Sequence, residues 1–287
     1  MKFTGAIYNI NTLYKCGKYL NSAILMCPKY AYIYEDDFTL DEAISYCLFN
    51  RIEVILSIQR IFLENELEQI KQFITKYKNY HFLVSDLGIV QIFIDLGILD
   101  HVIYHPDTLI CNSLDLSIYN QYHFLSLGLS NEITIQDVKD IYKNTKASIF
   151  YLIFGRKMMF YSKRKLLSLY KNYRKLEFDN KDLTLVEEKR SYHIPIYEND
   201  NGIYCYRHYY ISLLKDIKQL PFLDYGYFES LSLSDDQYLM ILKIFNDYLN
   251  NDVSLEQSIA LLNELNLPIE DGFSYQDTVY IKEKIVQ

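Results

Sequence analysis

The chain alternates short runs of apolar residues with longer segments in which apolar residues recur every three or four positions. Short apolar runs are typical of buried strands, and the wider spacing is typical of amphipathic helices. Their alternation predicts parallel strands joined by helical crossovers. The predicted strands are residues 2–8, 22–27, 52–58, 81–85, 102–104, 123–127, 148–154 and 222–228.

Helical patterns fill the segments between most of these strands. The pattern at residues 40–49 is opened by Thr39 and Asp41, whose residue types favour helix N-termini. Eight strands with intervening helices predict an α/β fold, a TIM-type (β/α)8-like barrel, in which functional groups lie at the C-terminal ends of the strands. The predicted helices are residues 40–49, 64–78, 88–96, 114–120, 135–142 and 163–173.

The alternation breaks at residues 179–210, which read as two or three antiparallel strands. Asn199, Asp200, Asn201 and Gly202 favour a tight turn, so we predict a β-hairpin inserted between the seventh and eighth barrel strands. Two more helical patterns, 235–250 and 254–265, predict a C-terminal helical extension over about residues 235–287. Because no repeat or linker divides the chain, we expect residues 1–287 to form a single domain.

The composition is that of a globular protein. Half of the 287 residues are apolar, which is enough for a large core. The longest apolar runs are far shorter than the roughly 20 residues of a membrane-spanning helix. Asn9, Asn11 and Thr12 interrupt the N-terminal segment before a signal-peptide core forms. We therefore expect a cytoplasmic protein without a membrane partner. The formal net charge of −8 argues against general nucleic-acid affinity but leaves room for one basic pocket.

No short motif nominates a metal site or a catalytic triad. GxSxG, Walker, HExxH and GxGxxG sequences are absent. His101 and His105 are spaced as i and i+4, and we interpret them as ordinary polar residues rather than metal ligands. The cysteines form no CxxC pair and their number is odd, so we expect buried free thiols. They are Cys16, Cys27, Cys47, Cys111 and Cys205.

A basic segment follows the seventh predicted strand. Residues 156–175 contain eight Lys or Arg and no Asp or Glu, in a chain that is acidic overall. Cations with interleaved aromatic rings can hold phosphates or other anions and stack on flat rings. The alternative is a solvated helix face whose leucines pack inward. The candidate anion-binding residues are Arg156, Lys157, Tyr161, Lys163, Arg164 and Lys165.

Four polar residues just past predicted strands are candidates for the barrel mouth. They are Asp86, Asn112, Glu132 and Glu229. In a (β/α)8 barrel, side chains at these positions face the functional end. Asp86 and Asn112 have an alternative role, because each precedes a predicted helix and can cap its N-terminus.

Six segments in order resemble the collagenase-like peptidase family U32. They are residues 52–74, 82–93, 110–119, 125–138, 154–170 and 194–214, and residues 271–275 resemble the family's closing glycine–phenylalanine turn. The resemblance implies a barrel. It also implies a choice of activities, because the family was named for proteolysis but includes oxygen-independent hydroxylases of tRNA, rRNA and quinone precursors. Several relatives hold a 4Fe–4S cluster, some work as pairs, and the tRNA members hydroxylate wobble uridine using prephenate.

Part of the family signature is present. It runs from a Glu through a Gly to two Cys seven residues apart and ends in Leu-Ser. The matching residues are Gly155, Tyr161, Ser162, Arg164, Leu167 and Ser168. The resemblance also matches Asn112, Glu132 and Glu229 to an asparagine and two acids of the family.

The cluster-binding part of the signature is missing. The two cysteine positions hold Met158 and Lys165, a further family cysteine falls near Ser212, and the opening acid position holds Phe150. An iron–sulfur cluster needs thiolates, which a thioether, an ammonium and a hydroxyl cannot replace. We therefore expect no cluster. Lys165 is expected to hold an anion or to pair with Glu132 or Glu229.

Three functions remain open. The first is a cluster-free component of tRNA uridine hydroxylation, beside a longer cysteine-bearing paralogue, whose basic segment binds tRNA or a carboxylate such as prephenate. The second is a peptidase, for which no nucleophile, base or metal set can be named. The third is a non-catalytic scaffold, a pseudoenzyme that has lost the signature residues. Fold alone does not decide among them.

Overall fold

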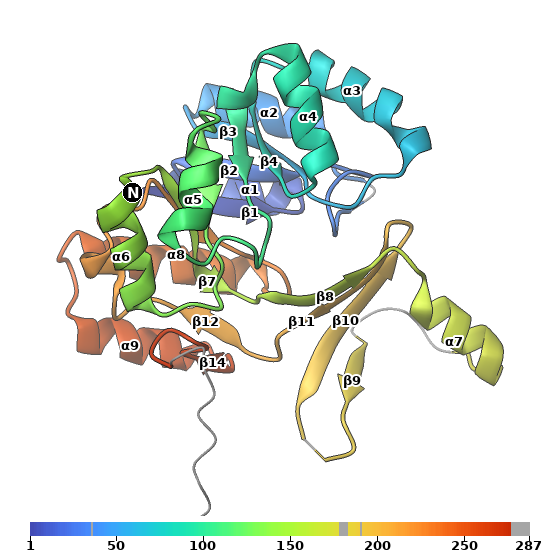
Figure 1. The fold of residues 1–287 in the computed structure, drawn as a ribbon. Helices are drawn as coiled ribbons and strands as arrows, with labels where there is room; N and C mark the ends of the chain where they lie inside the picture. Colours follow the sequence, from blue (N-terminus) through green and yellow to red (C-terminus); the bar gives the residue numbers. More distant parts are fainter. Residues whose placement is uncertain (36, 178–182, 190, 277–287) are drawn as a thin grey trace, which may run out of the picture.

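Eight parallel strands close into a barrel in the computed structural model, which describes residues 1–35, 37–177, 183–189 and 191–276 (Figure 1). The last barrel strand pairs with both the first and the seventh, and this double pairing closes the ring. The predicted TIM-type barrel is confirmed. Its strands are β1 (Lys2–Ile7), β2 (Ser22–Met26), β3 (Glu53–Ile58), β4 (His81–Val84), β5 (Val102–Tyr104), β6 (Ser126–Gly128), β7 (Ile149–Gly155) and β13 (Tyr225–Phe228).

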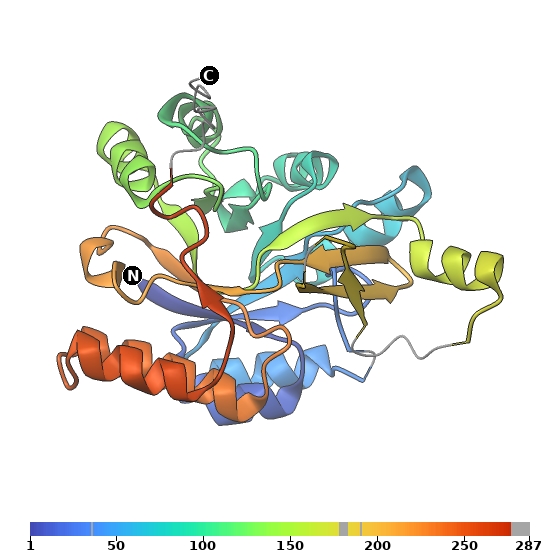
Figure 2. The ribbon, with the colours of Figure 1, turned by 90° about the horizontal axis from the view of Figure 1, so that it is seen from below.

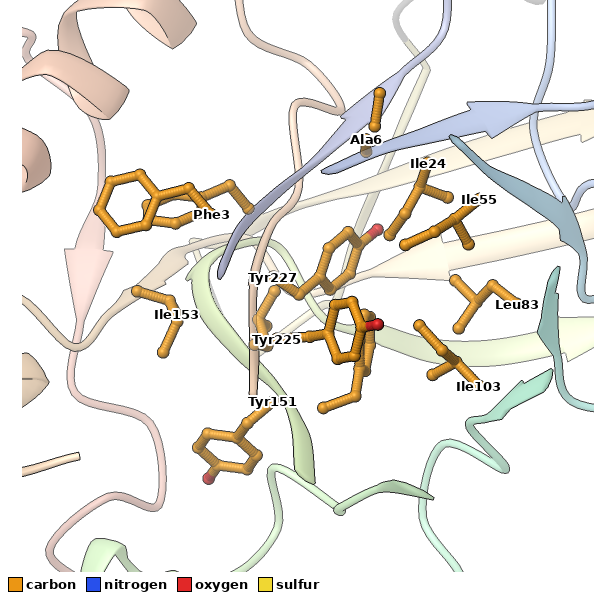
Figure 3. Close-up of a cluster of buried hydrophobic side chains, with 14 of the residues drawn as sticks. Phe3, Ala6, Ile24, Ile55, Leu83, Ile103, Tyr151, Ile153, Tyr225 and Tyr227 are labelled. Carbon is orange, nitrogen blue, oxygen red and sulfur yellow. The ribbon is translucent and has the colours of Figure 1, made fainter. Parts of the chain in front are cut away.

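The barrel interior is filled by side chains. Figure 3 shows Ile24, Ile55, Leu83 and Ile103, from four successive strands, pointing toward the rings of the last strand. Each of these four aliphatic side chains is completely buried. Removal of this apolar surface from water is the main stabilising contribution to such a core.

Helices cover the outside of the barrel (Figures 1 and 2). The longest, α8, begins with a capping box in which Ser234 and Gln237 each bond the other's backbone amide, and it buries one apolar face. No helix among the described residues is long and apolar enough to cross a membrane. The outer helices are α1 (Ile10–Cys16), α2 (Leu40–Phe49), α3 (Leu67–Lys76), α4 (Leu87–Leu96), α5 (Ser113–Asn120), α6 (Ile135–Thr145), α8 (Asp235–Leu249) and α9 (Leu255–Glu264), with 3-10 turns at Gly17–Tyr19, Glu64–Glu66, Leu99–His101 and Ile217–Gln219.

A four-stranded antiparallel sheet is inserted between β7 and β13. Its order is β8 (Met158–Ser162), β11 (Gly202–Tyr206), β10 (His193–Asn199) and β9 (Thr184–Val186). The predicted turn is confirmed, because Asn199 pairs with Gly202 across it. Two predictions were wrong: the insertion begins not near residue 179 but at β8, in the basic segment where no strand was predicted, and the helix expected from residue 163 begins later, as α7 (Leu166–Arg174). Residues 179–182 and 190 of the predicted hairpin region lie outside the described part.

Three further differences concern the barrel. The predicted sixth strand starts too early, because His123 has a left-handed backbone (φ 59°) and β6 begins at Ser126. The helix α1 was missed because polar residues interrupt its short pattern, although Asn9 caps it by accepting from the amide of Thr12. Two short strands, β12 (Tyr210–Ser212) and β14 (Ile269–Glu270), extend the barrel sheet beside β7. Residues 277–287 of the predicted C-terminal extension are outside the described part.

Candidate functional site

A polar pocket lies at the carboxyl ends of the barrel strands. Its cavity has a volume of about 60 Å³, and the inserted sheet contributes Met158 from β8 and Tyr206 from β11 to its wall. Side chains that follow β1, β3, β5, β6, β7 and β13 converge on it, as expected for this fold. They are Tyr8, Gln59, His105, Asp107, Asn131, Arg156, Lys157 and Glu229, and Met26, Tyr32, Ile33, Leu152 and Tyr227 complete the lining.

Glu229 is the buried acid of this pocket. Its carboxylate accepts hydrogen bonds from the hydroxyl of Tyr8 (3.0 Å), the hydroxyl of Tyr227 and the amide of Leu231 (2.9 Å). Burial raises the pKa of Glu229, although these donors oppose the shift. Burial, and then the charge of Glu229, raise the pKa of both tyrosines. The arrangement is a hydrogen-bonded cluster of one carboxyl group and two tyrosines in the wall of the cavity.

Gly155 makes room for this acid at the end of β7. Its φ of +140° lies in a region that other residues rarely adopt, and a Cβ atom there would lie 2.4 Å from the Cβ of Glu229. A side chain at position 155 would therefore displace Glu229. This steric conflict explains why the signature position identified in the sequence holds a glycine.

Two cations of the basic segment reach the pocket. Lys157 Nζ lies 2.7 Å from Oε1 of Glu132, and Arg207 also approaches that oxygen, at 3.5 Å. The guanidinium of Arg156 lies over the ring of Tyr210, 4.4 Å from its centroid. The buried Nε of Arg156 has no hydrogen-bond partner among the described residues, so one donor beside the pocket is unused.

His105 is a pocket residue that we had interpreted as an ordinary polar residue. Burial lowers the pKa of its imidazole, which favours the neutral form. Its Nδ1 lies 3.8 Å from Oδ1 of Asp107, too far for a hydrogen bond, and the hydroxyl of Tyr32 donates to the other oxygen of Asp107 at 3.1 Å. Its position immediately after β5 was the signal that could have identified it.

Two predicted mouth residues serve as helix caps instead. Asp86 accepts from the amides of Gly88 and Ile89 at the start of α4, although it also lines a neighbouring cavity of about 410 Å³. Asn112 accepts from the amides of Leu114 and Asp115 at the start of α5. Both residues therefore cap helices, and Asp86 in addition lines a cavity next to the mouth pocket.

The remaining four candidates do not line this pocket, although Tyr161 lines the neighbouring cavity of about 410 Å³. Tyr161 is stacked on Tyr204 with ring centroids 4.8 Å apart, and Lys163 pairs with Glu66 at 2.6 Å. Arg164 is exposed and lies between β8 and α7. The expected partner of Lys165 was wrong: its ammonium pairs with Asp200 in the turn after β10, at 2.5 Å. Of the six candidates, only Arg156 and Lys157 line the mouth pocket.

A closed eight-stranded barrel with convergent polar side chains at its carboxyl end defines a TIM-type barrel protein with a mouth pocket. The chain belongs to peptidase family U32, because the family model Peptidase family U32 matches residues 34–276.

Comparison with the structure of the U32 peptidase Mk0906 shows the fold. That structure matches with a TM-score of 0.51 and 9% identity, over 80% of this chain and 92% of that one. A chitinase from Chromobacterium violaceum matches with a TM-score of 0.44 and 10% identity, over 85% of this chain and 98% of that one. No curated protein matches the chain.

The residues present do not fit the cluster that several relatives hold. Met158 begins β8, Lys165 is paired with Asp200 three residues beyond its end, and Ser212 lies in β12. None of the three carries a thiolate. Phe150, at the position of the family's acid, is buried and stacked on Tyr227 with ring centroids 5.1 Å apart. These side chains provide packing and an ion pair rather than iron ligands.

Proposed function

We propose that this U32 protein is a cluster-free component of tRNA uridine hydroxylation and that its mouth pocket binds a carboxylate such as prephenate. The observation that carries the proposal is the pair of cations beside the cavity, Arg156 with its unused Nε and Lys157. A guanidinium N–H donor is well suited to a carboxylate oxygen. The cavity of about 60 Å³ suits the carboxylate end of a ligand, whose remainder would extend into the adjoining space.

The buried acid Glu229 affects the charge that a carboxylate ligand would meet. Because burial raises the pKa of Glu229, its proton is retained to a higher pH than that of an ordinary glutamic acid. Where it is protonated, it adds no negative charge to the pocket. Tyr8 and Tyr227 share its hydrogen bonds and line the same wall.

The redox group of the reaction would come from a partner in this proposal. Met158, Lys165 and Ser212 offer no thiolate, so a longer cysteine-bearing paralogue acting beside this chain is the expected source. A peptidase is less well supported, since the pocket lining contains no Ser, Thr or Cys nucleophile among the described residues. A non-catalytic scaffold would share the fold but would have no need of the two mouth cations.

The test is a gene deletion followed by mass spectrometry of tRNA nucleosides. We expect loss of wobble hydroxyuridine, restored by the wild-type chain and by Lys165→Gln, whose ion pair lies outside the pocket. Arg156→Gln combined with Lys157→Gln should fail to restore it. Unchanged hydroxyuridine in the deletion strain would contradict the function, and full rescue by the double variant would contradict the role of the mouth.

A further inference from the structure

The helix α7 is an outlying element with little burial. It lies at the end of the four-stranded sheet farthest from the barrel (Figures 1 and 2). Glu198 holds its first turn, accepting from the amides of Leu167 at 2.7 Å and Ser168 at 3.0 Å, and Leu167 packs on the small cluster beneath. No residue of α7 is buried. The sequence therefore maintains a helix whose outer face packs against none of the described residues.

The charge of this helix and its flanks is entirely positive. Residues 164–175 include five Lys or Arg and no Asp or Glu, whereas the whole chain carries a formal net charge of −8. Arg164, Arg174 and Lys175 have no ion-pair partner among the described residues. An anionic ligand is therefore attracted to this segment, in contrast to the net negative charge of the chain as a whole.

Aromatic rings project from the same face. Tyr170 is 51% exposed and Tyr173 is 82% exposed, and their spacing of three residues places them side by side on the helix. Exposed rings between unpaired cations form a platform on which bases stack while the cations hold phosphates. Leu169, 58% exposed, lies one helical turn before Tyr173 and adds apolar contact area.

We propose that α7 and its flanking cations form a binding surface for unpaired RNA, separate from the mouth pocket. The two most exposed apolar side chains of α7 are Tyr173 and Leu169, and cations flank the tyrosine, which favours RNA over a protein groove as the partner. A helix of nine residues is also short for docking into such a groove. The identity of the RNA as tRNA rests on the proposed function. The five residues of β8 span roughly 13 Å and separate α7 from the mouth pocket, so RNA on α7 would have to extend along the inserted sheet to reach the mouth.

The test is fluorescence anisotropy of a labelled tRNA with the purified full chain over a range of salt concentrations. Tyr170→Ala combined with Tyr173→Ala should weaken binding about tenfold or more through lost stacking. Arg174→Glu combined with Lys175→Glu should weaken binding. It should also make the slope of the logarithm of the binding constant against the logarithm of the salt concentration shallower by roughly 1.4, because two phosphate contacts are lost. The matched controls, Tyr122→Ala and Lys71→Glu combined with Lys78→Glu, change exposed residues elsewhere and should bind as the wild type does. Circular dichroism checks that each variant is folded.

Four results would overturn the inference: tRNA affinity unchanged in the α7 variants, affinity lost only with Arg156→Gln, no binding by the wild type at low salt, or equally strong binding to vesicles of anionic lipid. The two proposals fail separately. If the α7 variants bind tRNA normally while mouth variants lose hydroxyuridine, only this inference fails. If tRNA binding needs α7 but deletion of the gene leaves hydroxyuridine unchanged, only the proposed function fails.

Discussion

The imidazole of His105 lies so close to Gly128 that a Cβ atom on that glycine would be 2.2 Å from Cδ2 of the ring. The glycine ends β6, and the histidine follows β5, the neighbouring strand. On its other side the imidazole contacts the ring of Phe150, with centroids 5.3 Å apart. The absence of a side chain at position 128 therefore fixes where His105 enters the mouth pocket.

Gly128→Ala should destabilise the protein and move His105. The added methyl group has no space, and overpacking of this kind costs about 1–3 kcal/mol of the free energy of unfolding. Urea denaturation measures this cost. Adding His105→Ala removes the clashing ring, so the double variant should lose less stability than the two single changes predict together. Additive effects would show that the backbone moves instead of the ring.

Arg156→Gln should weaken binding of a carboxylate to the mouth pocket. A hydrogen bond to a charged group contributes about 1.5–3 kcal/mol, which corresponds to roughly 10–100-fold in affinity. Calorimetry with prephenate measures the change. Lys165→Gln is the control, because its ammonium pairs with Asp200 outside the pocket. An equal loss in both variants would point to a general charge effect rather than to a site.

Binding of a carboxylate should weaken as the pH rises. Burial raises the pKa of Glu229, so with rising pH its proton is lost only above the ordinary range, and the new negative charge repels the ligand. Glu229→Gln should remove this part of the dependence. His105, whose pKa is lowered by burial, and Asp107 face the same pocket, so His105→Gln serves as the comparison. If the wild type and Glu229→Gln have parallel pH profiles, Glu229 is not the responsible group.

The barrel could be predicted because its strands are local apolar runs between turn-forming residues, and six of the eight were placed within two residues at both ends. The inserted sheet was harder. The strand β8 pairs with β11, from Ser162 with Ile203 to Met158 with Tyr206, and a pairing between segments about 40 residues apart leaves no local signal. Met159 and Phe160 of this strand are exposed and stand among basic residues, so the segment lacks the pattern that is typical of a buried strand.

The site was predicted in part, for a related reason. Position after a strand identified Glu229 and Arg156 correctly as pocket residues, but it also selected Asp86 and Asn112, which turn toward helix amides. Whether such a side chain faces the barrel axis or caps the next helix depends on backbone geometry beyond the strand. Sequence spacing does not encode that direction.

Anaerobic incubation with iron and sulfide should yield no bound cluster. Met158, Lys165 and Ser212 occupy the family's cysteine positions, and four of the five cysteines are buried in separate places. Iron analysis after gel filtration measures the bound metal, with a cysteine-bearing U32 protein as the positive control. Stoichiometric iron and sulfide on this chain would show that other thiols have moved together. Chelator treatment should leave its thermal stability unchanged.

Glu53 should make the stability of the barrel depend on pH in the acid range. At the amino-terminal end of the barrel its carboxylate accepts from His81 at 2.7 Å, Lys2 at 2.7 Å, Ser22 at 2.7 Å and Tyr225 at 3.0 Å, joining five neighbouring strands. Burial alone would raise its pKa, but these hydrogen bonds outweigh burial and lower the pKa to about 2 from 4.5. The folded state thus releases this proton more readily than the unfolded state does.

The sign of the effect follows from that difference. The stabilisation is fully present above about pH 4.5 and is lost as the pH falls toward about 2, because the unfolded chain then binds the proton first. Glu53→Gln should therefore unfold more easily than the wild type at pH 7, by on the order of 2–3 kcal/mol, and the gap should narrow near pH 3. Urea titrations at both pH values measure it, with the exposed Glu64→Gln as control. A gap that stays constant between pH 7 and pH 3 would mean that Glu53 acts by shape and not by its charge.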